Sequence, residues 1–160
     1  VWRARSLGLE GSVVWAVPGR WLTLESAGSW LELRNASTEG PFADFEGDRI
    51  PARPWLHTTW AAHFRFAGLP SAEDTVEPYY RGRFVESFYR GWESQGLRAF
   101  KQVVDAQLTH SVGVTWTLRR AFARTTATFE IDNITDARVF DLFGVQRPGR
   151  GFFVKVTAQL

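Results

Sequence analysis

The sequence predicts an all-β fold, an antiparallel arrangement of about seven strands. The first observation is the closing segment, in which apolar residues occupy every second position: Phe152, Val154, Val156, Ala158 and Leu160. Apolar side chains with a period of two, on one face only, are typical of a half-buried strand. The second observation is that the same alternation recurs along the chain between short polar or Gly/Pro-containing segments. No helical period of comparable length interrupts it, so we expect a fold built of strands.

The first two predicted strands form a hairpin. Residues 7–17 alternate between apolar and small or polar side chains, and the sequence PGR at 18–20 is a tight-turn signal. Residues 21–33 then return with a similar pattern. Their alternation slips after Gly28, which predicts a β-bulge at that point.

The remaining five strands differ in the clarity of their pattern. Residues 56–66 alternate without a break, whereas residues 80–90 alternate only weakly. Residues 103–118 form the longest and clearest run, and residues 126–132 follow after a short turn. Residues 152–160 form the last strand. A terminal strand left open to water would promote aggregation, so we expect it to be paired within a closed sheet.

Three features favour a transmembrane β-barrel over a soluble sandwich or a lipocalin-like barrel. The strand at 103–118 needs about fifteen residues, against about 5–6 for a usual globular strand and about 9–11 to cross hydrocarbon. Short turns alternate with long polar loops at 35–49, 68–78 and 91–98, and membrane barrels have short turns on one side and long loops on the other. Five tryptophans lie near predicted strand ends, where interfacial aromatic residues are found: Trp15, Trp21, Trp55, Trp92 and Trp116. We therefore expect the strands to cross a membrane.

Composition excludes several classes of function. The chain has 160 residues and no cysteine, so it has neither a disulfide framework nor a cysteine-ligated zinc site. Its formal net charge is only +2, which gives no bulk attraction for nucleic acid. No stretch approaches the ~20 apolar residues of a spanning helix. The first residue is Val rather than Met, so we expect a processed chain or a part of a longer one.

The polar side chains give little support for catalysis or metal binding. His57 and His63 share a strand face but lie roughly 20 Å apart, too far to share a metal ion. Glu130 and Asp132 share a face with Arg124, which is more typical of a wetted wall of mixed charge than of catalytic carboxylates. No triad motif surrounds the other candidates for a nucleophile and a base: Ser87, Ser111 and His110. We therefore expect no enzymatic activity, no cofactor and no metal site.

Several short motifs carry a resemblance to a known family. They are, in order, ARSLGLE at 4–10, RIPARP at 49–54, YRGR at 80–83, DNITD at 132–136 and PGR at 148–150. In order and spacing the chain resembles the C-terminal part of the barrel of TonB-dependent outer-membrane receptors. The resemblance implies a 22-stranded barrel that is plugged by an N-terminal domain and lies in the outer membrane of a Gram-negative bacterium.

The resemblance also implies a function and partners. Such receptors import scarce substrates, such as siderophore-bound iron, cobalamin or sugars, and the inner-membrane protein TonB supplies the energy. The implied partners are outer-membrane lipid, TonB acting through an N-terminal part, the barrel-assembly machinery and a small-molecule substrate, with no nucleic acid. About seven strands cannot close a barrel of that size, so we expect residues 1–160 to be its C-terminal portion, without the plug domain. The strand at 152–160 would be the assembly signal, although Leu160 stands where outer-membrane proteins usually have an aromatic residue.

Alternation then assigns side chains to the lumen and to the outside. The residues expected to face the lumen and contact the plug are Arg83, Asp105, Gln107, Thr109, Glu130, Asp132, Lys155 and Thr157. The three long loops would face outside, where Phe42 and Trp92 would contact substrate. The alternative is a soluble β-barrel or sandwich whose apolar stripes converge on an interior and bind a small apolar ligand. A catalytic barrel in the outer membrane is a third and weaker possibility.

Overall fold

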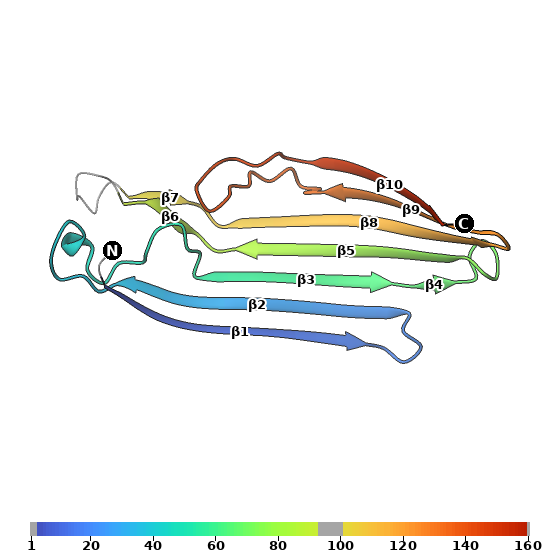
Figure 1. Ribbon diagram of the computed structural model, residues 1–160, viewed down its shortest axis with the longest axis horizontal. Helices are drawn as coiled ribbons and strands as arrows, with labels where there is room; N and C mark the ends of the chain where they lie inside the picture. Colours follow the sequence, from blue (N-terminus) through green and yellow to red (C-terminus); the bar gives the residue numbers. More distant parts are fainter. Residues whose placement is uncertain (1–2, 93–100, 160) are drawn as a thin grey trace.

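The structure is a computed structural model, and it describes residues 3–92 and 101–159. Its elements are β1 (Ala4–Ala16), β2 (Leu22–Asn35), the short 3-10 helix η1 (Ala43–Phe45), β3 (Leu56–Phe64), β4 (Phe66–Ala67), β5 (Thr75–Val85), β6 (Phe88–Gly91), β7 (Gln102–Val104), β8 (Gln107–Arg120), β9 (Ala123–Asp132) and β10 (Gly151–Gln159). The long strands form one antiparallel sheet in the order β1-β2-β3-β5-β8-β9-β10, with β4 beside β5 (Figure 1). The all-β, antiparallel prediction is confirmed. The sheet is open, because within the described residues β1 pairs only with β2 and β10 only with β9.

The predicted bulge at Gly28 is wrong. β1 and β2 pair without interruption from Ala4↔Asn35 to Ala16↔Thr23, and Gly28 lies opposite Gly11 in this register. A Cβ at Gly28 would lie 3.3 Å from the Thr58 methyl group of β3. The glycine therefore breaks the apolar pattern because it makes room for a neighbouring strand, and the register does not shift.

The strand predicted at 80–90 begins five residues earlier, since β5 starts at Thr75 and contains Pro78. Proline cannot donate to a ladder and is usually excluded from central strands. Pro78 pairs with Val114 of β8, but it lies beyond the last β3 partner of β5, Tyr79↔His63, and before the β4 pairs. Pro78 therefore lies at the break between β3 and β4, where no strand on that side needs an N–H group from β5.

The strand predicted at 103–118 is two strands. β7 ends at Val104 and pairs with β6, whereas β8 begins at Gln107. Val104 is buried with Val85 and Phe88 in a small cluster, and this burial takes β7 out of the main sheet. Asp105 lies in the connection and is exposed, so it does not join the ladder of lumen-facing residues that the sequence predicted.

The predicted position of the loop at 68–78 is also wrong. The connections after β2, β5 and β9 lie at one end of the sheet, here called the long-loop end (Figure 1). The connections after β1, β3–β4 and β8 lie at the opposite, tight-turn end, where Asp74 accepts a hydrogen bond from Arg119 N of the β8–β9 turn at 3.1 Å. An antiparallel chain changes ends at every strand, so residues 68–74 cannot lie beside the loop at 35–49.

The sheet has almost no core of its own. Among the described residues five apolar side chains are buried, whereas twenty-one large apolar side chains are exposed. The buried cluster of Val85, Phe88 and Val104 lies at the long-loop end and packs against Phe140. Most apolar side chains of the strands lie instead on one open face of the sheet, although Val14 and Phe153 are exposed on the other face. In the part of the chain that the structure describes, no helix is both long enough and apolar enough to cross a membrane.

Asp74 fastens the tight-turn end of the sheet. Its side chain is fully buried and accepts hydrogen bonds from Arg120 Nη1 at 2.8 Å and from Arg119 N at 3.1 Å. The hydrogen bond from Arg120 is the main cause that lowers the pKa of the Asp74 carboxyl from 3.8 to about 2. The ionised form is therefore favoured in the folded protein.

We expect Asp74→Asn to lower stability at neutral pH. Because the folded-state pKa lies below the unfolded value, the stabilisation by Asp74 is complete above pH 3.8 and is lost as the pH falls through about 2. The unfolding temperatures of wild type and Asp74→Asn, followed by tryptophan fluorescence, should therefore differ at pH 7 and converge near pH 2. Glu73→Gln, at the exposed neighbouring carboxylate, is the matched control. A difference between wild type and Asp74→Asn that is independent of pH would contradict this role for the carboxylate.

Candidate functional site

The polar face of the sheet is also its hollow face. A trough of about 840 Å³ extends across the sheet from β1 to β10 and is lined by residues that include Glu25, Thr59, Arg81, Arg83, Thr109 and Glu130. The opposite face carries the apolar positions, such as Leu9 of β1 and Val154 of β10, which are 71% and 73% exposed. The two faces therefore differ in chemistry along the whole sheet, as the period of two predicted.

Register places most of the predicted lumen residues on the hollow face. Arg83 pairs with Thr109 between β5 and β8, and Val85 pairs with Gln107. On β9 and β10, Thr128 pairs with Lys155 and Thr126 with Thr157, two and four residues along from Glu130. Paired residues share a face, so the side chains that gather here are Arg83, Gln107, Thr109, Glu130, Asp132, Lys155 and Thr157. Asp105 is the exception described above.

Glu130 is the centre of a polar network that the sequence analysis missed. Tyr79 Oη donates to Glu130 Oε2 and Arg81 Nη2 donates to Glu130 Oε1. The Arg81 guanidinium also lies over the Tyr79 ring, 5.2 Å from its centroid. The Tyr79 ring lies against Gly113 of β8, where any Cβ would overlap it. The sequence contained one indication of this contact. Gly113 is an isolated glycine in the clearest strand pattern, and such a glycine often marks a place where another group packs closely against the backbone.

The other charged groups on the hollow face are paired less completely. Ser111 Oγ donates to Asp132 Oδ1 across β8 and β9. Arg83 Nε donates to His57 Nε2 at 3.3 Å, and no carboxylate of the described residues forms an ion pair with Arg83. Arg83 and Arg147 line one hollow of about 300 Å³ at the long-loop end. Asp132 is the carboxylate that lines the same hollow, so two positive charges face one negative charge there.

Gln107 shares this face but does not line open space. Its side chain is 5% exposed, and its Oε1 accepts a hydrogen bond from Phe140 N at 2.7 Å. Phe140 lies in the loop between β9 and β10 and packs on the buried cluster. Gln107 therefore fastens that loop to the wall of the trough.

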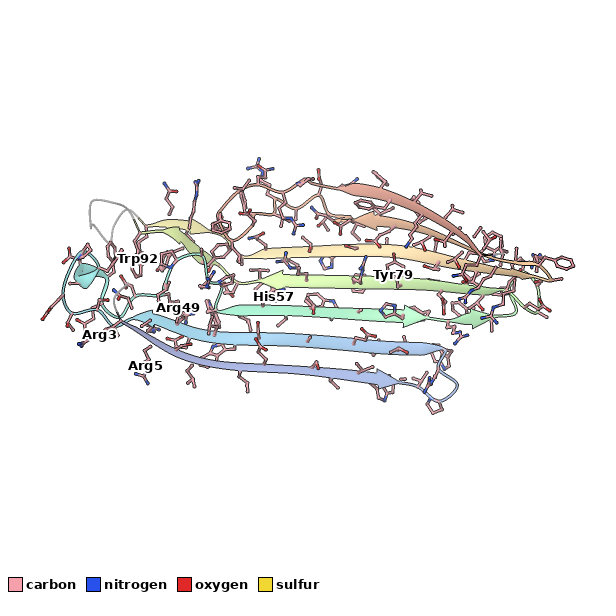
Figure 2. All side chains as sticks on the ribbon, viewed as in Figure 1. Arg3, Arg5, Arg49, His57, Tyr79 and Trp92 are labelled. Carbon is pink, nitrogen blue, oxygen red and sulfur yellow. The ribbon has the colours of Figure 1, made fainter. Side chains whose placement is uncertain are left out.

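Phe42 and Trp92, the predicted substrate contacts, pack against other loop residues. The Trp92 ring stacks on Phe45 at a centroid distance of 4.8 Å and contacts Phe42 at 5.7 Å. Trp92 Nε1 also donates to Arg49 O at 3.2 Å, as the labelled side chains at the long-loop end illustrate (Figure 2). These contacts join the loop after β2 to the end of β6. Residues 93–98 of the third predicted loop lie outside the described residues.

The closing strand has the predicted alternation. Phe152, Val154, Val156 and Ala158 of β10 lie on the apolar face and are exposed, and among the described strands β10 pairs only with β9. Leu160 lies outside the described residues. The other edge of β10 has free backbone donors and acceptors that no described strand pairs, which suits addition of a further strand.

The candidates for catalysis and metal binding do not come together. His110 and Ser111 are successive residues of β8 and lie on opposite faces of the sheet. His110 lies on the apolar face, where its Nδ1 is hydrogen-bonded to Tyr80 Oη at 2.6 Å. Within residues 3–92 and 101–159, no three His, Asp or Glu side chains are grouped as a metal site would need.

Comparisons with known proteins give a fold and no family. The sequence matches no protein family, and it matches no curated protein. Among solved structures it is similar to the crystal structure of BauA, the ferric preacinetobactin receptor from Acinetobacter baumannii. The TM-score is 0.75 over 97% of this chain, at 16% sequence identity. The chain spans about a fifth of that receptor, 22% of its length, so the likeness establishes the fold of this part alone.

Proposed function

We propose that the chain is a C-terminal part of the β-barrel of a TonB-dependent outer-membrane receptor, a transport protein rather than an enzyme. The observation that carries this proposal is the pair of opposite faces on one continuous meander. The apolar face is open and the polar face is hollow, which suits a wall with lipid outside and water inside. Between its two edges the sheet satisfies its backbone groups by pairing neighbouring strands, as hydrocarbon demands.

The soluble alternative is less well supported. A sandwich or small barrel would bury its apolar stripes against each other or around a ligand. Here Leu9, Val13 and Val154 are 62–73% exposed on one face, and the described residues provide no second layer to cover them. An open apolar face of this extent would promote aggregation in water. Lipid covers it without a further protein layer.

The aromatic side chains at the tight-turn end support the same orientation. Trp15, Trp21, Phe66 and Trp116 are 39–54% exposed near the ends of their strands, and Phe122 in the β8–β9 turn is 90% exposed. Aromatic residues at this level form the girdle of a membrane barrel. The short turns would then face the periplasm and the long loops the outside.

The substrate class we propose is a siderophore–iron complex, and the support is the ferric preacinetobactin receptor to which the fold is similar. In this proposal Arg83, Thr109, Glu130, Asp132, Lys155 and Thr157 line the lumen. They face a plug domain supplied elsewhere in the protein, whose movement TonB drives. The assembly machinery would pair the free edge of β10 with a first barrel strand.

Fractionation of cells that produce the full-length protein tests this proposal. We expect the protein in the outer-membrane fraction, and we expect its gel mobility in mild detergent to shift on boiling, because a closed barrel resists unfolding by the detergent. Growth under iron limitation should depend on the protein when a siderophore is the only iron source. A soluble product that folds without detergent and shows no shift would overturn the proposal.

A further inference from the structure

The apolar face of β1 and β2 ends abruptly at the long-loop end. Along β1 the outward positions run Trp15, Val13, Gly11, Leu9 and Leu7, and the next is Arg5. Along β2, Trp30 is followed on the same face by Glu32 and Arg34. Arg5 pairs with Arg34 and Leu7 with Glu32, so the change occurs at one level on both strands.

Three arginines surround one carboxylate at this level. Glu32 accepts from Arg34 Nε and, at 3.0 Å, from Arg49 Nη2, and it interacts electrostatically with Arg5. Arg5, Arg34 and Arg49 are here called the arginine patch. Its net charge with Glu32 is +2, three positive charges against one negative. Arg5 lies at the start of β1 and Arg49 nearby in the loop after β2, both toward the long-loop end (Figure 2).

The arginine patch has donors that the described residues do not satisfy. The Arg5 side chain is exposed and makes no hydrogen bond within the described part of the chain. Arg49 Nη1 is buried without an acceptor there, while its guanidinium lies 4.9 Å from the centroid of the Trp55 ring. Arg34, with its side chain 45% exposed, is held by a hydrogen bond from Nη1 to Gly47 O at 2.8 Å. Two of the three guanidinium groups are therefore fixed in place, and the patch lacks acceptors rather than donors.

The height of the arginine patch along the strands indicates which part of the membrane it would contact. Trp15 to Leu7 is eight residue steps, roughly 26 Å along the strand at ~3.3 Å per residue. Because barrel strands tilt by about 35–45°, those roughly 26 Å correspond to roughly 20 Å of height, so Leu7 lies just below the upper edge of an apolar band about 25 Å tall if Trp15 lies at the lower interface. Arg5, one outward position further, would lie among the headgroups of the outer leaflet. Arginine there pairs with phosphate through two parallel N–H···O bonds.

We propose that the arginine patch is a binding site for a phosphorylated lipid headgroup of the outer leaflet. This inference rests on the proposed function, because the level of the patch has meaning only if the apolar face is in lipid. The site is on the outside of the barrel, apart from the trough, and would hold lipid against β1 and β2 without contacting the transported substrate.

The test measures binding to the purified full-length protein in neutral detergent, after its heat-dependent gel shift has been verified. The probes are bisphosphorylated lipid A, its dephosphorylated form and inorganic phosphate, followed by tryptophan fluorescence. We expect tight binding of the bisphosphorylated lipid only. Each surface arginine contributes about fivefold, so Arg5→Gln should weaken binding about fivefold and Arg5→Gln with Arg34→Gln roughly 25-fold. Arg124→Gln, an exposed arginine near the tight-turn end, should leave binding unchanged.

Each outcome either supports or overturns the proposed lipid site. Equal binding of the dephosphorylated lipid, or unchanged affinity in the double variant, would overturn the inference. Competition by inorganic phosphate at the same concentration would overturn it too, since the site would then bind free anions. Arg5→Gln removes no hydrogen bond within the described residues, so this variant tests the site without disturbing the fold. A protein with a normal heat shift but no phosphate-dependent binding contradicts only this inference, whereas a missing heat shift contradicts the proposed function itself.

Discussion

Leu9→Arg is expected to destabilise the folded protein by about 2–4 kcal/mol, the cost of a charge on the lipid face of a barrel at mid-depth. Leu9 lies near the middle of β1 on the apolar face and is 71% exposed in this chain. In water, a substitution at so exposed a position changes stability by less than about 0.5 kcal/mol. The expected cost therefore arises from lipid and not from lost packing. Urea unfolding of the full-length protein in bilayers of defined composition measures it.

The matched control is Ser12→Arg, which places the same side chain on the hollow face of the same strand. Ser12 is exposed and lines the trough, so its arginine would meet water and should leave stability nearly unchanged. A soluble sheet predicts equal, small effects for both variants. Equal effects in the bilayer would therefore reject the assignment of lipid and water to the two faces.

The faces of the strands could be predicted from sequence because they depend on a local rule. Successive side chains of a strand point to opposite sides, so Val154 and Glu130 could each be placed on a face without knowledge of any partner strand. The same rule placed Lys155 and Thr157 together with Glu130 once the strands paired in register. A bulge at Gly28 would have reversed every face beyond it. The glycine instead makes room for Thr58, a contact with another strand that the local pattern does not contain.

The contacts between distant residues could not be predicted in this way. Tyr79, Arg81 and Glu130 meet only because β5, β8 and β9 have one particular register, which depends on the whole sheet. Asp105 does not lie in a strand with the other predicted lumen residues, because the preceding residue, Val104, is buried in a cluster formed by β5, β6 and β7. The end of the sheet at which residues 68–74 lie follows from the order of the strands and not from loop polarity, which was the signal used.

Gly82→Ala is expected to destabilise the protein by about 1–3 kcal/mol, the usual cost of forcing an extra methyl group into a packed site. Gly82 lies in the middle of β5 on the apolar face, opposite Trp60 of β3 and His110 of β8. A Cβ at this position would overlap three atoms of the Trp60 indole: Cε2, Cζ2 and Nε1. The clash would also displace Trp60 Nε1 from Tyr80 Oη, 3.4 Å away.

The partners of Trp60 make this displacement costly. Tyr80 Oη links the Trp60 indole to His110, so three polar side chains on the apolar face satisfy one another. In hydrocarbon no water replaces a lost partner, and an unsatisfied donor there adds to the cost of the clash. Gly11→Ala is the control, because Gly11 lies on the same face of β1 with nothing within 4 Å of an added Cβ. It should change stability by less than about 0.5 kcal/mol.

A double-mutant cycle separates the clash from the general cost of changing a glycine. In a Trp60→Ala background the indole is absent, so Gly82→Ala should become nearly neutral, with a coupling energy of about 1–3 kcal/mol between the two positions. Equal costs of Gly82→Ala in the two backgrounds would show that backbone freedom, and not the indole, requires glycine there. If the coupling is found, the Trp60 ring packed on Gly82 holds β3 and β5 together on the apolar face, and the hydrogen bond of Tyr80 to His110 extends this contact to β8. The hollow side repeats this arrangement, since Tyr79 lies against Gly113 one strand further on. On both faces of the sheet, an aromatic ring would then pack on a glycine of the neighbouring strand. The polar atom of each ring would be hydrogen-bonded to another side chain and not to water.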